Sequence, residues 1–378
     1  MKTSGRIHMS EVDRQKPARS LADLRREINK TDDHILELLN QRARLCLAVG
    51  AVKSETDETV FKPFREKEVL SRLIAANPGV LPEDHLRAIY REILSSSRKL
   101  QKPQRAVYLG PEGTFSFFAG VELLGSSTDF ESCRNLDGVF AAVAGNKATL
   151  GIVPLENSLQ GSVGQNLDLF LKYDVYIQAE MFCRISHFLM GTGRDLADVK
   201  TVCSHARALE QCMGWLDTHL PDAEFVPVRS TAVAAEKAAQ RPDWAAIGHR
   251  KLADMFSLNI FASHIQDTPD NWTRFIVIGN EPPEGGNRDK TSLLFTLSDR
   301  SGALVNVLQI LAHGNINMRK LESRPLPSET MRYMFFADVE CDLTSDEYAD
   351  LKAELAAHCH TLRILGSYPA GQYKEEER

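Results

Sequence analysis

The sequence contains no apolar run near the roughly 20 residues that a helix needs to cross a bilayer. Its first 17 residues, MKTSGRIHMSEVDRQKP, also lack the apolar stretch that a secretory signal requires. These absences argue against a membrane-spanning helical protein. We expect a protein of the cytoplasm with no membrane partner.

Cysteine is sparse and never paired at short range. The seven residues are Cys46, Cys133, Cys183, Cys203, Cys212, Cys341 and Cys359. An odd number at wide spacing, with no CxxC, argues against a disulfide framework and a zinc site. We expect buried, reduced thiols and no metal centre.

A basic stripe with interleaved aromatic residues is missing as well, so we expect no nucleic-acid partner. Of the 378 residues, 43% are hydrophobic and 25% charged, as in a globular protein of two or three domains. The net charge of −6 is unevenly spread: residues 1–102 carry 20 Lys and Arg against 15 Asp and Glu, and the remainder 25 against 36. This change of sign predicts a domain boundary near Lys102-Pro103.

The first hundred residues predict helices. Positions 21, 24, 28, 31, 35, 38, 42, 45, 49 and 52 keep a 3,4 spacing and eight of these ten are apolar, which indicates one long helix with Ser20 as its N-cap. Arg65-Glu66 open a second helix that ends near Asn77-Pro78-Gly79, and a third begins at about Glu83. Arg42 falls in the apolar seam, where it either pairs with an acid, extends to water or meets an anion.

Further cations and neutral donors accompany Arg42. Arg25 and Lys53 flank the seam, and the third helix carries Ser97 and Gln101 at i,i+4 spacing. Such a set favours a polar cavity for a small dianion. Three helices with this spacing resemble the all-helical chorismate mutase family over almost the whole segment.

That resemblance implies an all-α three-helix domain with defined residue roles. The implied site has Arg25 from the partner subunit, Arg42 and Arg65 on the carboxylates, Lys53 and Gln101 at the ether oxygen, and Glu66 and Ser97 on hydroxyl or carboxylate groups. A pericyclic rearrangement of chorismate to prephenate needs no nucleophile, because holding the reactive conformer and stabilising charge on the breaking C–O bond are sufficient.

From Arg105 onward, short β-rich runs alternate with helical patterns. The clearest strands are predicted at residues 106–109, 150–153, 201–203, 245–247 and 275–278, which indicates a parallel α/β architecture. Three motifs, GPEGTFS at 110–116, PLENS at 154–158 and NWTRF at 271–275, are interpreted as strand ends that open into turns. Because ligands bind outside the carboxyl ends of strands, we expect one crevice to collect all three.

Two more polar positions precede helical patterns. Ser204 and Ser230-Thr231 are placed as N-caps, and because anion binding uses the same geometry, both functions remain open. With GPEGTFS, GIVPLENSLQGSV, CSHARALEQC, RSTAVAAEKA, AAIG and NWTRF in this order, residues 105–280 resemble prephenate dehydratase. The chain departs from residues frequent in that family at Ala206-Arg207 and at His249.

The second resemblance implies a two-lobed α/β domain like that of periplasmic binding proteins. The implied pocket is formed by Glu156, Asn157, Ser158, Ser204, Gln211, Thr231, Thr273, Arg274 and Phe275. Thr273 would donate a hydrogen bond to the departing ring hydroxyl, and Arg274 would bind the pyruvyl carboxylate. Glu156 would be either a protonated relay or a structural carboxylate. Phe117 or Phe118 would line the wall beside the departing carboxylate, and no cofactor is required.

Residues 281–290 form a linker rich in proline and glycine. Beyond it the order βαββαβ is predicted, with strands at 292–297, 318–322, 333–340 and 361–367 and helices at 304–313 and 345–358, as in the ferredoxin-like α+β unit. GALV and ESRP resemble the phenylalanine-binding marks of this family's ACT domain, which implies inhibition by L-phenylalanine. The implied effector site comprises Gly302, Ala303, Leu304, Val305, Glu322, Ser323, Arg324 and Pro325.

Together the segments predict a multidomain protein with a helical mutase domain at 18–102, a dehydratase domain at 103–282 and an ACT domain at 290–370. We expect a bifunctional, L-phenylalanine-inhibited enzyme that acts on chorismate and prephenate as a homodimer or a larger homo-oligomer. Two alternatives stay open: a dehydratase whose helical segment only dimerises, and a non-enzymatic small-molecule sensor.

Overall fold

The computed structural model describes residues 20–56, 60–159, 161–162, 164–286, 288–326 and 333–374. Two compact units divide the chain, Met1–Glu58 and Thr59–Arg378, and each is described by itself. Residues 1–17, whose order the sequence left open, lie outside the described residues. Among the helices in the described ranges, none is both long and apolar enough to cross a membrane.

The first unit is represented by one helix, α1 (Leu21–Thr56), which confirms the predicted long helix. Ser20 caps it as predicted: its hydroxyl accepts a hydrogen bond from the Asp23 backbone N–H at 3.2 Å, and the Asp23 carboxylate accepts one from the Ser20 backbone N–H at 3.3 Å. Apolar side chains of the seam are exposed, with Leu21 at 65% and Val52 at 63%.

The second unit opens with α2 (Pro63–Ala76) and α3 (Glu83–Gln101), close to the predicted bounds. Helix α3 packs on α4 (Phe115–Leu124), where Arg98 donates to the carbonyl oxygen of Leu124 and Arg91 forms an ion pair with Glu122. The compact units divide at Glu58, before α2, so α2 and α3 belong to the second unit. The domain bounds that we gave stay a prediction.

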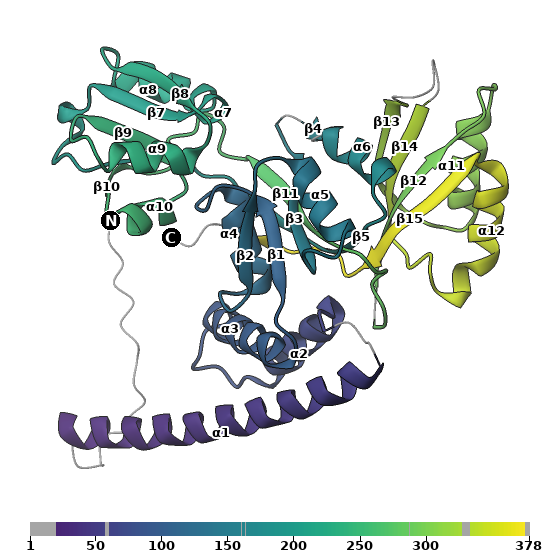
Figure 1. Cartoon of the computed structure of the whole chain (residues 1–378), viewed down its shortest axis with the longest axis horizontal. Helices are drawn as coiled ribbons and strands as arrows, with labels where there is room; N and C mark the ends of the chain where they lie inside the picture. Colours follow the sequence, from purple (N-terminus) through teal and green to yellow (C-terminus); the bar gives the residue numbers. More distant parts are fainter. Residues whose placement is uncertain are drawn as a thin grey trace, which may run out of the picture. The chain divides into compact units, whose positions relative to one another are not determined.

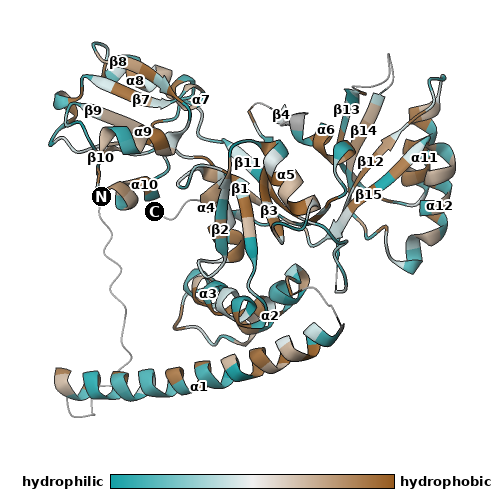
Figure 2. Cartoon of the chain, viewed as in Figure 1, coloured by the Kyte–Doolittle hydropathy of each residue, from teal (hydrophilic) through white to brown (hydrophobic). Residues whose placement is uncertain are grey.

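The first lobe is built on a sheet of order β16-β5-β11-β3-β1-β2, with β4 paired to β3 (Figure 1). Its strands are β1 (Arg105–Leu109), β2 (Asp129–Cys133), β3 (Leu150–Asn157), β4 (Gly161–Ser162), β5 (Tyr176–Arg184), β11 (Trp272–Gly279) and β16 (Tyr373–Lys374), and its helices are α4, α5 (Leu136–Ala144) and α6 (Gly164–Lys172). Apolar residues dominate the central strands, as Figure 2 shows, because helices cover them.

The second lobe has the strand order β10-β6-β9-β7-β8. Its elements are β6 (Phe188–Gly191), η2 (Leu196–Asp198), β7 (Thr201–His205), α7 (Ala206–Glu210), α8 (Met213–His219), β8 (Glu224–Val228), α9 (Thr231–Ala238), β9 (Trp244–Gly248), α10 (Lys251–Phe256) and β10 (Asn259–Ala262). The chain crosses between lobes twice, after β5 and before β11, which confirms the two-lobed α/β fold.

Both sheets are mixed, so the prediction of a parallel architecture is wrong in part. Strand β1 runs parallel to β2 and β3, and β7 runs parallel to β8 and β9. Strand β11 is antiparallel to both β3 and β5, because the chain returns from the second lobe and inserts it between them. This insertion brings the end of PLENS beside NWTRF.

The C-terminal module, residues 290–368, confirms the predicted βαββαβ order. Its elements are β12 (Lys290–Thr296), α11 (Ala303–His313), β13 (Met318–Pro325), β14 (Tyr333–Val339), η3 (Asp346–Tyr348), α12 (Ala349–His358) and β15 (Thr361–Tyr368), in the antiparallel sheet order β13-β14-β12-β15. One face of this sheet, with Phe295 and Val339, packs under α11 and α12. The other face, with Phe336 and Tyr368, joins the core of the first lobe.

Candidate functional site

The ends of β3 and β11 hold the centre of the candidate site. Asn157 and Thr273 are cross-strand partners, and Asn157 Nδ2 donates to Thr273 Oγ1 at 2.9 Å. The same nitrogen lies 2.7 Å from Asn271 Oδ1. Two motifs separated by more than a hundred residues therefore share one hydrogen-bond network.

The direction of this network follows from a backbone contact. The Leu159 backbone N–H donates to Asn157 Oδ1 at 3.1 Å, so the amide nitrogen of Asn157 must face Thr273. Thr273 Oγ1 consequently accepts that bond and keeps its own hydrogen for another acceptor. Since Thr273 is only 8% exposed, its hydroxyl is a directed donor at the strand ends.

Ser158, the last residue of PLENS, links the ends of β3 and β11. Ser158 Oγ accepts a hydrogen bond from the Trp272 backbone N–H at 2.9 Å and donates to the Asp270 carbonyl oxygen at 3.1 Å. Asn271, which the sequence analysis did not assign to the site, is 1% exposed, and within the described ranges its Nδ2 has no hydrogen-bond partner. The sequence could have indicated Asn271 as a site residue, because it is the first residue of the NWTRF motif.

The second lobe contributes an imidazole and an amide. His187 is 2% exposed, and its Nε2 lies 2.8 Å from Gln211 Oε1. The Phe115 ring lies 5.8 Å from the His187 ring and 5.5 Å from the His249 ring, so the GPEGTFS loop and the second lobe meet here. His249 stacks on Phe118 at 4.3 Å. Gln211 thus faces the same crevice region as the glycine-rich loop.

The structure confirms one of the two predicted N-caps and contradicts the other. Ser230 caps α9 as expected, accepting a hydrogen bond from the Val233 backbone N–H at 3.1 Å, and Thr231 is the first helical residue. Ser204 instead lies within β7, is fully buried and donates to the Ile247 carbonyl oxygen at 2.7 Å. His205 caps α7, so the predicted cap at Ser204 is wrong.

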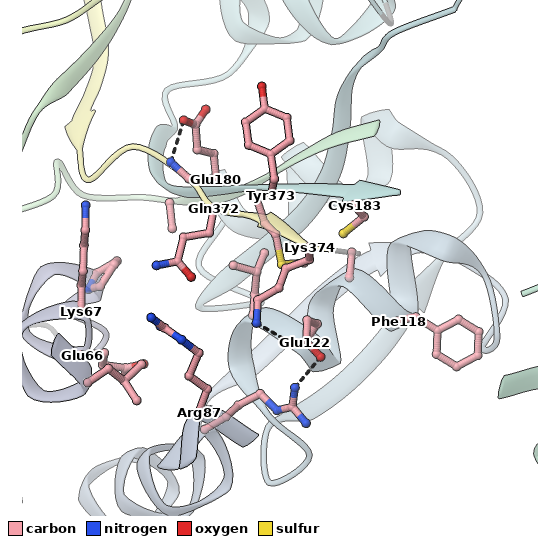
Figure 3. Close-up of a pocket in the computed structure, with 18 of the residues that line it drawn as sticks. Glu66, Lys67, Arg87, Phe118, Glu122, Glu180, Cys183, Gln372, Tyr373 and Lys374 are labelled. Atoms are coloured by element: carbon pink, nitrogen blue, oxygen red, sulfur yellow. Dashed lines mark hydrogen bonds and ion pairs between the residues drawn. The ribbon is translucent and has the colours of Figure 1, made fainter. Parts of the chain in front are cut away.

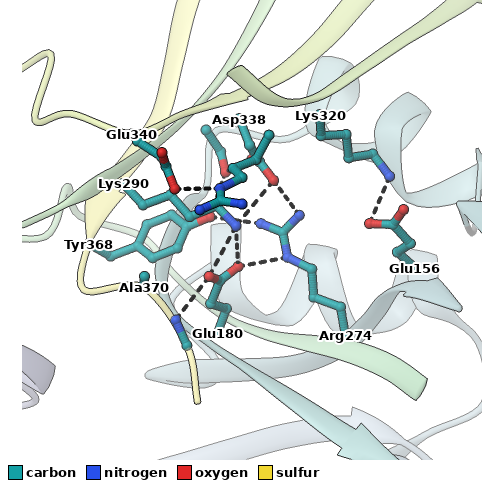
Figure 4. A network of polar contacts seen from close by, with 12 residues as sticks. Glu156, Glu180, Arg274, Lys290, Lys320, Asp338, Glu340, Tyr368 and Ala370 are labelled. Carbon is teal, nitrogen blue, oxygen red and sulfur yellow. Dashed lines mark hydrogen bonds and ion pairs between the residues drawn. The ribbon is translucent and has the colours of Figure 1, made fainter. Parts of the chain in front are cut away.

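Arg274 points away from the crevice. Its guanidinium, 2% exposed, pairs with the carboxylates of Glu180 and Asp338 and donates to Tyr368 Oη at 2.9 Å (Figure 4). Burial works to lower the pKa of Arg274, but Asp338, Tyr368 and Glu180 outweigh it and raise that pKa. The role predicted for Arg274, binding the pyruvyl carboxylate, does not fit these contacts.

Two further predicted pocket residues also lie outside the crevice. Phe275 is 2% exposed and packs in a core cluster with Met181 and Ile185, because it belongs to the buried part of β11. Glu156 Oε2 forms an ion pair with Lys320 Nζ at 2.9 Å. This ion pair with the C-terminal module fits the structural alternative for Glu156 rather than a place in the crevice.

The residues of the predicted mutase site are divided between the units. Arg25, Arg42 and Lys53 lie on α1 in the first unit, and Arg65, Glu66, Ser97 and Gln101 lie on α2 and α3 in the second. In the second unit Glu66 pairs with Arg98, and Ser97 Oγ donates to the Ile93 carbonyl oxygen at 2.6 Å. The complete helical site stays a prediction.

A pocket of about 980 Å³ lies in the second unit beside α2, α3, α4, β5 and β16. Glu66 lines it on one side, and Phe118 and His249 of the crevice region line it on another. Figure 3 shows Lys374 beside Glu122, an ion pair at 3.5 Å. The pocket is therefore lined by both the predicted mutase segment and the predicted dehydratase segment of this unit.

The predicted effector residues fall on two faces of the C-terminal module. Gly302, Ala303, Leu304 and Val305 form the N-terminal end of α11. Side chains alternate along β13, so Ser323 and Pro325 share one face, whereas Glu322 and Arg324 share the other. Arg324 Nη2 lies 3.3 Å from Asp168 on α6, so this second face meets the first lobe.

We expect His249 to make stability depend on pH. Burial, followed by the charge of Lys251, lowers the pKa of His249 to about 3, below the roughly 6.5 of an unfolded chain. Between these values only the unfolded state binds the proton, so the free energy of unfolding falls as pH falls below about 6.5. His249→Gln should reduce that slope by up to about 1.4 kcal/mol per pH unit. Urea unfolding at several pH values measures this slope. The control is His360→Gln, which changes an exposed histidine. Equal slopes in the His249→Gln and His360→Gln proteins would contradict the assignment.

Two α/β lobes that meet at a polar crevice, with helices before them and a βαββαβ module after them, define a multidomain α/β protein with its site between the lobes. A family model described as prephenate dehydratase matches residues 106–283, and one described as chorismate mutase type II matches residues 24–102. A bifunctional chorismate mutase/prephenate dehydratase of Aquifex aeolicus is 37% identical over 359 residues, covering 94% of this chain and 99% of that protein. The chain belongs to the bifunctional chorismate mutase/prephenate dehydratase family.

Two solved structures resemble the larger part of this chain. The prephenate dehydratase of Arthrobacter aurescens in complex with L-Phe is 33% identical, with a TM-score of 0.63 over 70% of this chain and 90% of that chain. A structure described as GqqA, a novel type of quorum quenching acylases, is 29% identical, with a TM-score of 0.64 over 71% of this chain and 98% of that chain.

Proposed function

We propose that this protein rearranges chorismate to prephenate and then converts prephenate to phenylpyruvate with loss of water and CO₂. It is a bifunctional enzyme of phenylalanine biosynthesis, as the family and the near full-length relative support. The observation that carries the dehydratase half is the direction of the Asn157–Thr273 hydrogen bond. It turns the Thr273 hydroxyl into a donor.

In the dehydratase reaction the ring C–O bond breaks as the ring carboxylate leaves as CO₂, and the electrons of the broken C–C bond complete the aromatic ring. Negative charge therefore develops on the departing oxygen, which takes up a proton from solvent and leaves as water. A hydrogen bond from Thr273 stabilises that charge, and a donor of this kind contributes about 10² to 10³ in kcat. Asn157 holds the hydroxyl in its donating orientation, and Gln211 and Asn271 supply further amide groups.

In the mutase reaction the helical residues bind and fold the substrate. Arg42 and Arg65 bind carboxylates through their planar guanidinium groups, and Arg25 is supplied by a second copy of the chain. Lys53 and Gln101 stabilise charge at the ether oxygen. The exposed apolar seam of α1 supports a homodimer formed through this helix.

We assign the C-terminal module to the ACT class and L-phenylalanine to it as inhibitor. The βαββαβ order, the GALV and ESRP segments and the L-Phe complex of a 33% identical dehydratase support this assignment. The effector would contact the α11 end and β13. A cytoplasmic location stays a prediction.

Two assays on the purified full-length protein test the proposal. We expect loss of chorismate, formation of phenylpyruvate from added prephenate, and inhibition of the second reaction by L-phenylalanine. Phenylpyruvate formation without chorismate loss would leave a dehydratase with a helical dimerisation segment. Absence of both reactions would leave a small-molecule sensor.

A further inference from the structure

Two pairs of cross-strand neighbours face each other where the first lobe meets the C-terminal module. Glu156 of β3 is the register partner of Arg274 of β11, and Lys320 of β13 is the register partner of Asp338 of β14. Each acid pairs with the base of the opposite sheet: Lys320 with Glu156 at 2.9 Å, and Arg274 with Asp338 (Figure 4). We call these four residues the crossed clamp.

The crossed clamp lies directly behind the site. Successive residues of a strand point to opposite faces, so Glu156 and Arg274 face the module, whereas their neighbours Asn157 and Thr273 face the hydrogen-bond network described above. Asn157 and Thr273 are themselves register partners. Glu156 and Arg274 are the chain neighbours of Asn157 and Thr273. A displacement of either clamp residue therefore moves the backbone that carries the donor hydroxyl.

The two halves of the clamp differ in burial. The Arg274 and Asp338 side chains are each 2% exposed and share their charges with Glu180 and Lys290, which lies 3.2 Å from Asp338. Breaking a pair this deep leaves an uncompensated buried charge, so this half is a fixed attachment. The other half is more accessible, with Lys320 at 12% and Glu156 at 35% exposure.

Lys320 also contacts a second carboxylate of its own strand. Its Nζ lies 3.4 Å from Glu322 Oε2, against 2.9 Å from Glu156 Oε2. Glu322 belongs to ESRP, the segment that we assign to the effector. The Lys320 ammonium thus lies between Glu156 of β3 and the effector segment, and a displacement of Glu322 alters the attraction of Lys320 to Glu156.

We propose that Lys320 of the C-terminal module is a positioning residue of the dehydratase site. It holds Glu156 and thereby keeps Asn157 and Thr273 in donating geometry, and its contact with Glu322 makes that geometry respond to the effector. This inference rests on the proposed dehydratase function for its kinetic consequence. The effect of the Lys320–Glu156 contact on the positions of Asn157 and Thr273 does not require turnover.

Full-length Lys320→Gln protein tests the proposal. Dehydratase kcat should fall roughly tenfold with little change in KM, because misplacing a reacting group lowers turnover more than binding. The half-inhibitory concentration of L-phenylalanine should rise, and mutase turnover should stay unchanged. Lys320→Arg, which keeps the charge, should restore most of the dehydratase kcat.

Arg319→Gln is the matched control. Arg319 precedes Lys320 on β13, points to the other face and forms an exposed ion pair with Glu340. If Lys320→Gln and Arg319→Gln give the same dehydratase kcat and the same response to L-phenylalanine, Lys320 has no positioning role.

Hydrogen–deuterium exchange separates this inference from the proposed function. Lys320→Gln should speed amide exchange in residues 154–158 and 271–275 relative to Arg319→Gln, whether or not either protein turns over prephenate. If Lys320→Gln does not fold, Glu156→Gln provides the same comparison, because it removes the partner charge of Lys320 and should speed exchange in the same segments. Unchanged exchange in those segments, or Lys320→Arg behaving as the Gln variant, would overturn the proposal even in an active enzyme.

Discussion

Thr273→Val should lower dehydratase kcat by about 10² to 10³ and leave mutase turnover unchanged. Valine keeps the shape of threonine but removes the hydrogen that Thr273 holds for the departing oxygen, and losing one such donor has a cost of this size. Asn157 would also lose its acceptor at 2.9 Å. Phenylpyruvate formation from prephenate measures the first effect, and chorismate loss measures the second.

Thr273→Ser supplies the matched comparison, because it keeps the hydroxyl and should retain most of the activity. Thr296→Val tests for a general effect of burying a methyl group, since Thr296 is 7% exposed and bonds to Thr361 in the C-terminal module. A Thr273→Val protein with full dehydratase turnover would refute the donor role.

Arg42→Ala should abolish mutase turnover and spare the dehydratase. A guanidinium binds a carboxylate through two parallel hydrogen bonds, and no other side chain reproduces that geometry, so Arg42→Lys should also lose most mutase activity. The expected loss is on the order of 10² or more, because substrate positioning supplies much of this reaction's acceleration. Chorismate consumption in the purified full-length protein measures it.

Arg44→Ala, an exposed arginine of the same helix, serves as the control and should keep both activities. Loss of dehydratase turnover in a folded Arg42→Ala protein would contradict the two-site arrangement. Intact mutase turnover in that variant would show that Arg42 does not bind a carboxylate of chorismate.

The motifs predicted which segments meet, but not which side chains face the crevice. Asn157 and Thr273 come together as expected, whereas Glu156 and Arg274, each one residue earlier or later, face the C-terminal module. Strand alternation in PLENS and NWTRF carries this distinction. The sequence could not show where Arg274 finds its acids, because Glu180 and Asp338 come from distant strands.

The order and direction of the strands could not be predicted from the sequence, for a related reason. The predicted strands at 106–109, 150–153, 201–203, 245–247 and 275–278 are all present, but their direction depends on the two crossings between lobes. Strand β2, with the sequence DFESC, is mostly exposed and lacks the apolar run that marks a buried strand. The helices were more predictable because their period is local, as α1 and α11 illustrate.

The last described strand, β16, pairs with β5 of the first lobe, and its Tyr373 stacks on Phe182 at 4.6 Å. The C-terminal module is therefore connected at both ends to the same sheet. The chain enters the module after β11 and leaves it toward β16. Removing the chain from the module onward would also remove β16, so the first lobe would lose an edge strand of its own sheet.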